Sequence, residues 1–291
     1  MTLFALSLIV AAAFTHATWN YLSKRVSGGA AFVWLFAALS AILYAPLAWY
    51  VFFSQNVMLD ATRVLIIAGS GLIHALYFLA LQRGYQAGDL SLVYPLARGT
   101  GPMLSTFAAI LLFGERPSPL ALGGALLVVG GVFLLTWSAT ARIDARGARK
   151  NRAWAVGYGL LTGLLIASYT LWDKQAVSAM MIPPIVFENG ASFSRAVLLS
   201  PIAIRQWSDV KREWRAHPKE ILAIALLSPL SYLLVLTAMV TTPVSYVAPA
   251  RELSILIGAV MGTRLLGERD ARRRLIAASA IGAGVVALAL G

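Results

Sequence analysis

The chain has 291 residues, of which 59% are hydrophobic and only 12% are charged. Soluble domains carry roughly 25% charged residues, so this composition excludes an ordinary water-soluble protein. The net charge of +12 would suit nucleic acid, but the basic residues lie in short stretches between long apolar runs. That placement is typical of orientation signals facing anionic lipid, so we expect a lipid bilayer as partner and no nucleic acid.

Ten apolar segments follow one another along the chain, each close to the roughly 20 residues that cross a hydrocarbon core. The first lacks the positively charged start of a signal peptide, so we expect it to be retained as a helix. The sequence therefore predicts an all-α polytopic membrane protein with ten transmembrane helices. The segments are 3–22, 30–53, 64–82, 90–113, 119–138, 153–173, 183–204, 220–241, 244–265 and 273–290.

The first segment carries polar side chains where lipid would favour apolar ones. His16, Trp19 and Asn20 are spaced by three and four residues, which places them on one helical face. Either this face packs on a neighbouring helix, with His16 in an interhelical hydrogen bond, or it lines a wet pathway. In a pathway, His16 and Trp19 would contact substrate, His16 could carry a proton, and Asn20 would have a gating or structural role.

The third and fourth segments add further candidates. Tyr77 could bind a ligand or stabilise a helix contact. Arg98 lies about eight residues into its segment, where an ionised side chain costs roughly 2.5 kcal/mol or more and needs a cavity or a partner. Pro95 removes a helical hydrogen bond and would let the helix bend. Glu115 ends the segment, where it could accept from the free N–H groups of the next helix as a structural or gating element.

The longest polar interruption, residues 138–153, falls in the middle of the chain. It predicts a first five-helix repeat over residues 1–138, a basic cytoplasmic linker over 139–152 and a second repeat over 153–291. Three residue types recur at one offset of 153 residues: Trp19 and Trp172, Arg98 and Arg251, Gly114 and Gly267. A five-span unit duplicated in tandem must insert its second copy upside down, so we expect inverted repeats with a site between them.

In the second repeat, the sixth segment repeats the polar face of the first. Tyr169 and Asp173 correspond to His16 and Asn20, and Asp173 is a further gating or structural candidate. Glu188 and Arg195 are two helical turns apart in the seventh segment and favour an internal polar pair. Tyr232 in the eighth corresponds approximately to Tyr77 and shares its two interpretations.

The ninth segment holds the strongest pair of candidates. Arg251 and Arg98 would approach the bilayer middle from opposite sides, where two guanidinium groups could grip a carboxylate or phosphonate, unless each is locked structurally. Glu252 could carry a proton, meet an ammonium group, or form a fixed salt bridge to Arg98 or Arg195. Pro249, like Pro95, would let its helix bend. Glu268, like Glu115, would accept hydrogen bonds at a helix end as a structural or gating element.

The glycine-rich fifth and tenth segments carry almost no polar groups, which favours close helix packing, within the fold or in a homodimer. No nucleotide-binding loop or metal-spaced cluster is recognisable, so we expect no cofactor and no metal. Any active transport would then depend on a gradient or on exchange.

The motifs HATWN at 16–20, YPLARGTGP at 94–102 and PARELSILIGAVMGTRLLGER at 249–269 resemble the EamA branch of the drug/metabolite transporter superfamily. The resemblance covers essentially the whole chain. It implies a permease of a bacterial-type inner membrane that moves small metabolites, often outward, through a cavity formed by the first four helices of each repeat. The small multidrug members carry a glutamate in their first helix, whereas this chain has His16, which argues against antiport of cationic drugs.

Lysine and arginine give the orientation. Eighteen of the 24 fall after odd-numbered segments and three after even-numbered ones, which predicts both termini outside. Many ten-span relatives are thought to have cytoplasmic termini; the charges favour the opposite.

We expect a secondary transporter of small anionic or zwitterionic metabolites, such as amino acids or organophosphonates, working by alternating access and as an exporter. A lipid flippase or a non-transporting scaffold on the same fold is one alternative. A membrane enzyme acting on a lipid-linked substrate is disfavoured, because no Ser/His/Asp set can be placed together. We therefore expect no enzymatic activity.

Overall fold

The computed structural model describes residues 1–26, 29–87, 90–140, 149–257 and 271–291, and the regular structure in those ranges is entirely helical. Every predicted apolar segment falls on a helix, the ninth only as far as residue 257. The helices are α1 (Leu3–Val26), α2 (Ala30–Ser54), α3 (Ala61–Ala87), α4 (Leu90–Phe113), α5 (Pro119–Thr140), α6 (Arg149–Lys174), the π-helical turn η1 (Gln175–Ala179), α7 (Pro184–Arg205), α8 (Trp207–Ala216), α9 (Pro218–Thr241), α10 (Val244–Ala250) and α12 (Ala271–Leu290).

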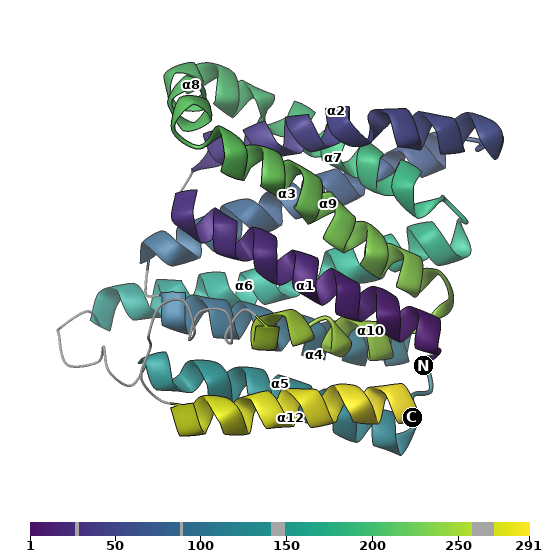
Figure 1. Cartoon of the computed structure of the whole chain (residues 1–291), viewed down its shortest axis with the longest axis vertical. Coiled ribbons are helices and arrows are strands. Elements are labelled where there is room, and N and C mark those ends of the chain that lie inside the picture. Colours follow the sequence, from purple (N-terminus) through teal and green to yellow (C-terminus); the bar gives the residue numbers. More distant parts are fainter. Residues whose placement is uncertain (27–28, 88–89, 141–148, 258–270) are drawn as a thin grey trace.

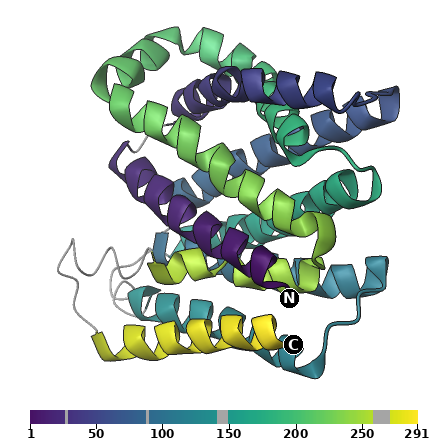
Figure 2. The same ribbon diagram turned by 45° about the vertical axis from the view of Figure 1, so that its right-hand side comes forward.

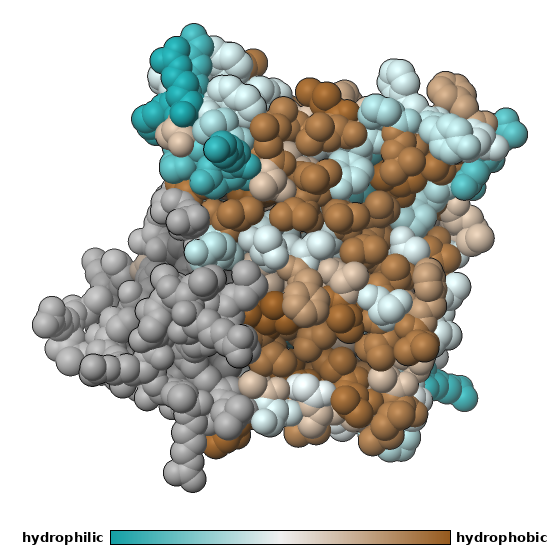
Figure 3. Space-filling model, in the orientation of Figure 1, coloured by the Kyte–Doolittle hydropathy of each residue, from teal (hydrophilic) through white to brown (hydrophobic). Residues whose placement is uncertain are grey.

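Six helices in the described residues are long and apolar enough to cross a membrane: 3–23, 30–54, 61–84, 96–113, 153–179 and 218–241. α5 and α12 contribute shorter apolar stretches, while α7 carries Glu188 and Arg195 and is more polar. A broad hydrophobic surface covers the middle of the molecule (Figure 3). Hydrophilic residues lie over α8 at the upper left and at several points along the right-hand edge. Large side chains such as those of Trp49 and Leu112 are exposed on the outside. The chain is a multi-pass helical membrane protein.

The helices form a stack in which both halves of the chain interleave (Figure 1). α2 lies against α7 at one edge of the stack, and α5 lies against α12 at the other. Between these pairs, α1 packs on α9, and α6 packs on both α3 and α4. Each of α1 to α5 therefore has its main packing partner in the second half of the chain. The interior of the molecule is thus built from helices of both halves.

The two chain ends lie close together, at the lower right of the molecule in Figure 1 and near each other again in Figure 2. The Met1 ammonium group donates to the Ala289 carbonyl at 3.3 Å. α8 lies at the far corner of the molecule from both ends (Figure 1).

α8 lies in the polar stretch between the seventh and eighth predicted segments. Its Val210 is buried, and Trp207 meets Trp34 of α2 edge-on with ring centroids 6.0 Å apart. Arg212 bonds Asp209 of the same helix at 2.8 Å. These contacts hold a ten-residue helix that is too short and too polar to span a bilayer.

The ninth predicted segment is not continuous. α10 ends at Ala250, and a turn at Arg251 and Glu252 precedes helical residues 253–257. Across this turn the N–H groups of Glu252, Ser254 and Ile255 bond carbonyls three residues back, at 3.0, 3.2 and 2.9 Å. Pro249 has no N–H and its ring disfavours a regular α-helix at this point. The break leaves two charged residues on irregular backbone; residues 258–265 of the segment lie outside the described residues.

Glycine allows the close crossing of α5 and α12. A Cβ on Gly124 would lie 2.7 Å from the Gly284 carbonyl oxygen, and one on Gly284 would lie 2.6 Å from that of Gly124. Neither position admits a side chain without separating the helices. The glycine-mediated packing expected for these segments is thus present within the chain.

Candidate functional site

Arg98 of α4 and Glu252 of the broken segment form a buried ion pair. Arg98 Nε lies 3.1 Å from Glu252 Oε2, and Arg98 Nη2 donates to Ser254 Oγ at 3.3 Å. The two residues are 6% and 2% exposed. Of the two arginines considered for Glu252 from sequence, Arg98 is the one in contact. The pair joins the two halves of the chain at their centre.

Arg251 faces an aromatic ring instead of a carboxylate. Its guanidinium carbon lies 5.4 Å from the ring centroid of Tyr232 on α9, within cation–π range. Among the described residues Arg251 makes no salt bridge, since Glu252 next to it in sequence is engaged with Arg98. Glu252 therefore pairs with Arg98, while Arg251 rests on the Tyr232 ring.

Both arginines line a small cavity between α1, α4, α9 and the turn after α10. His16 and Ser231 complete its polar wall, and Ile9, Ala12, Ala13 and Val235 its apolar wall. The cavity has a volume of only about 10 Å³, far below the roughly 300–1,000 Å³ typical of ligand pockets. His16 Nδ1 lies 3.3 Å from Ser231 Oγ, and the histidine tautomer decides which atom donates.

Trp19 and Asn20 share the helix face of His16 but do not line this cavity. Trp19 packs edge-on against His16 with ring centroids 4.8 Å apart, within an apolar cluster that includes Phe36 and Ile224. Its buried Nε1 has no acceptor among the described residues. The Asn20 side chain is half-buried and likewise makes no hydrogen bond in the described part of the chain.

A second polar cluster surrounds Asp173, which is completely buried at 0% exposure. Its Oδ2 atom lies 3.1 Å from His74 Nε2 of α3 and also accepts from the Tyr232 hydroxyl. Tyr169 stacks on His74 with ring centroids 4.2 Å apart, and Tyr77 meets Tyr169 edge-on at 5.7 Å. Tyr77 and Tyr232 thus belong to one aromatic cluster.

Sequence analysis did not predict the partnership of His74 and Asp173. The residues are 99 positions apart, and nothing local in either segment indicates the other. The available signal was that both are ionisable groups in apolar helices, each of which needs a partner.

Glu188 and Arg195 form the internal polar pair that their spacing favours. Their nearest charged atoms are 3.8 Å apart. Ser192 lies between them, donating to Glu188 Oε1 at 3.1 Å and accepting from Arg195 at 2.8 Å. The Arg195 guanidinium also lies 5.8 Å from the Phe78 ring.

Glu115 caps a different helix from the one expected. Its two carboxylate oxygens accept from the backbone N–H groups of Val244 and Ser245, at 2.7 and 2.8 Å. These groups begin α10 in the second half, whereas sequence analysis expected the following helix, α5. Gly114 adopts a positive φ of 65°, and this left-handed residue ends α4 and turns the chain towards α10. Glu268, the counterpart of Glu115, lies outside the described residues.

The two proline candidates have different settings. α4 runs as one helix from Leu90 to Phe113 through the position of Pro95, so no break occurs there. Pro249 is buried in the last turn of α10, directly before the break at Arg251.

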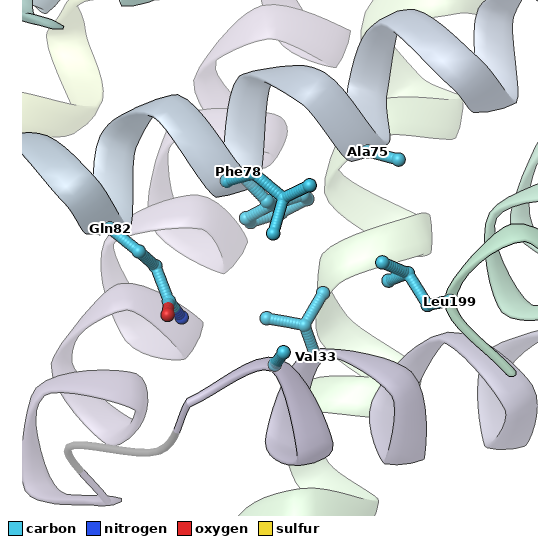
Figure 4. A pocket seen from close by; sticks show the side chains of 7 residues that line it. Val33, Ala75, Phe78, Gln82 and Leu199 are labelled. Atoms are coloured by element: carbon cyan, nitrogen blue, oxygen red, sulfur yellow. The ribbon is translucent and has the colours of Figure 1, made fainter. Parts of the chain in front are cut away.

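A second gap, with a volume of about 10 Å³, lies between α2, α3 and α7 (Figure 4). Its wall is apolar apart from the Gln82 amide, with Val33, Ala75, Phe78 and Leu199 around it. The described residues that line it are uncharged.

Comparison with known proteins shows the family. The EamA-like transporter family matches the chain twice, over residues 3–137 and 153–290. No curated protein matches it. One solved crystal structure, whose name states no function, superposes with a TM-score of 0.71 over 98% of each chain at 14% identity, which shows a shared fold alone. The chain belongs to the EamA-like transporter family, within the drug/metabolite transporter superfamily of membrane permeases.

Proposed function

We propose that this protein is a secondary transporter of small anionic or zwitterionic metabolites, such as amino acids or organophosphonates. The observation that carries the proposal is the cavity lined by both Arg98 and Arg251, in which Arg251 has no carboxylate partner among the described residues. An unbalanced buried guanidinium is costly in a membrane, and an anionic ligand would offset that cost.

The substrate groups follow from these side chains. A planar carboxylate or phosphonate suits the fork of Arg251, which also keeps its contact with the Tyr232 ring. Glu252 could exchange Arg98 for the ammonium group of a zwitterion, or accept a proton and release Arg98. His16 and Ser231 would add neutral hydrogen bonds at the same wall.

We infer ten membrane spans in two inverted five-helix repeats, over residues 1–138 and 153–291. Helix contacts support this, because they occur in pairs related by exchanging the halves. In the order of the predicted segments, α1, α2, α3, α4 and α5 of the first half correspond to α6, α7, α9, α10 and α12 of the second. The contact α1–α9 then matches α6–α3, α3–α7 matches α9–α2, and α4–α5 matches α10–α12. The two matches to the family, one in each half, support it as well.

Alternating access would open the cavity to one side at a time, since its present volume is too small for most metabolites. The break after Pro249 supplies a hinge beside the two charged residues. We propose export across a bacterial-type inner membrane, with basic loops in the cytoplasm and both termini outside, and no catalytic step.

Purified protein would first be tested for ligand binding by thermal unfolding, with glycine, glutamate, acetate, methylphosphonate and tetraphenylphosphonium as probes. A ligand at about 100 times its Kd adds roughly 2.7 kcal/mol of stability. We expect anionic or zwitterionic probes to stabilise the native protein and Arg251→Ala to lose that response. Arg215→Ala, on exposed α8, is the matched control and should respond like the native protein.

Transport itself would be measured in proteoliposomes with the same compounds in radiolabelled form. The proposal fails if no compound moves faster than in empty vesicles. Flipping of a labelled phospholipid without any soluble transport would instead support a lipid flippase.

A further inference from the structure

We infer that His74 and Asp173 form a proton-binding site, separate from the arginine cavity and linked to it by Tyr232. The coupling role of this site rests on the proposed transport function, whereas its ability to bind a proton does not.

The site is a buried acid with an incomplete set of partners. Oδ2 of Asp173 accepts from Tyr232 and lies 3.1 Å from His74 Nε2. Oδ1 has no hydrogen-bond partner among the described residues. A fully buried carboxylate with one bare oxygen is costly while it is ionised and His74 is neutral. One proton on the pair converts a net negative charge into a neutral pair or an internal ion pair, and so removes that cost.

The charges around the pair come from several helices. α7 contributes Arg195 and Glu188, which face each other at 3.8 Å and largely offset one another. α6 contributes Tyr169 beside His74, and the turn after α10 contributes Arg251. Lys174, next to Asp173 in sequence, donates to the Met239 and Thr242 carbonyls. Arg251 acts on the pair as well, and it has no carboxylate partner among the described residues.

Tyr232 connects this charge to the pair. Its hydroxyl donates to Asp173, while its ring lies under the Arg251 guanidinium. When an anion binds Arg251, the positive charge that opposes a proton on the pair is neutralised, and the pair should bind a proton more tightly. Because linkage is reciprocal, the proton would strengthen anion binding by the same factor. The geometry therefore points to co-transport of one proton with a monoanion.

The proton site is tested by NMR of histidine labelled with ¹³C at the Cε1 position, in protein embedded in nanodiscs. The chain has three histidines, so His16→Gln and His217→Gln assign the signals. We expect the His74 signal to report one protonation between about pH 5 and about pH 9. In Asp173→Asn, the imidazole should stay neutral over that range, because a buried histidine without its carboxylate gains nothing from charge.

Two further variants make the test specific. Glu188→Gln removes another buried carboxylate and should leave the His74 protonation in place. Tyr232→Phe keeps the ring under Arg251 but removes the hydroxyl that donates to Asp173. It should raise the pH at the midpoint of the His74 protonation by about one unit, a tenfold increase in proton affinity. This variant also serves if Asp173→Asn does not fold.

The proton site is overturned if His74 shows no protonation in the native protein, or the same protonation in Asp173→Asn. An unchanged midpoint in Tyr232→Phe overturns the link to the arginine cavity. The measurement needs no substrate, so it separates the two proposals. Protonation of His74 in a protein that moves no compound retains the proton site and removes only the proposed transport function.

Discussion

The charged side chains at the centre of this protein are arranged across its two halves. Arg98 from the first half meets Glu252 from the second at 3.1 Å, and both are buried. A buried ion pair adds little net stability, because desolvation offsets the attraction between the charges. Losing one partner is much more costly, since the other charge is left buried and alone.

This asymmetry gives a prediction for Arg98. Replacement by methionine should destabilise the protein by about 3–5 kcal/mol, because Glu252 is left without its partner. Adding Glu252→Gln should restore most of that stability while leaving anion binding impaired. Thermal unfolding of the single and double variants, with and without methylphosphonate, measures both effects. A double variant no more stable than Arg98→Met would contradict the ion-pair interpretation.

Sequence analysis identified most of the residues at the centre but few of their partners. Arg98, Arg251 and Glu252 stand out because charge inside an apolar helix demands an explanation. That Asp173 receives both His74 and Tyr232 could not be derived, since the contact depends on how three helices cross. Trp19 was expected to contact substrate, yet its ring packs in an apolar cluster behind His16.

At the scale of helices, long apolar runs were sufficient to predict helical structure within the described residues, because a bilayer permits few other structures. Two features were not predictable in this way. α8 is short and charged, so nothing in hydropathy distinguishes it from a loop. The break after α10 depends on Pro249 acting together with the contacts of Arg251 and Glu252, whereas Pro95 leaves α4 unbroken.

Neighbouring glycines in α5 provide a matched pair of substitutions. Gly124→Ala would place its Cβ 2.7 Å from the Gly284 carbonyl oxygen, and we expect a loss of about 1–3 kcal/mol. At Gly123 a Cβ meets no atom within 4 Å, so Gly123→Ala should be neutral or stabilising by up to about 1 kcal/mol. Thermal unfolding of both variants is the measurement. Equal effects would mean that α5 and α12 do not cross closely at Gly124.

The contact of Glu115 with α10 predicts a stability effect between elements. Glu115→Ala leaves the N–H groups of Val244 and Ser245 without their acceptor and should cost about 1–2 kcal/mol. Glu213→Ala, on α8, is the control: its carboxylate makes a loose 3.8 Å pair with exposed Arg212, so stability should change by no more than about 1 kcal/mol. Unfolding temperatures that fall equally in both variants would argue against the cap.

For the whole molecule, orientation can be tested directly because the chain contains no cysteine. Ser208→Cys lies on exposed α8, and Gln55→Cys lies at the exposed end of α2. With basic loops inside, a membrane-impermeant maleimide added to intact cells should label Gln55→Cys and reach Ser208→Cys only after the membrane is opened. The reverse pattern would place both termini in the cytoplasm.

The hydrogen bond between the Met1 ammonium group and the Ala289 carbonyl has a consequence for the order in which the two halves could be encoded. A few residues would join the two ends without disturbing a helix, and new ends could then be opened between α5 and α6. In such a circular permutant the second half would be synthesised first, yet each helix would meet the same neighbours. Because each helix of one half packs mainly on the other half, we expect residues 1–140 and 149–291 produced as two separate polypeptides to assemble into the same molecule.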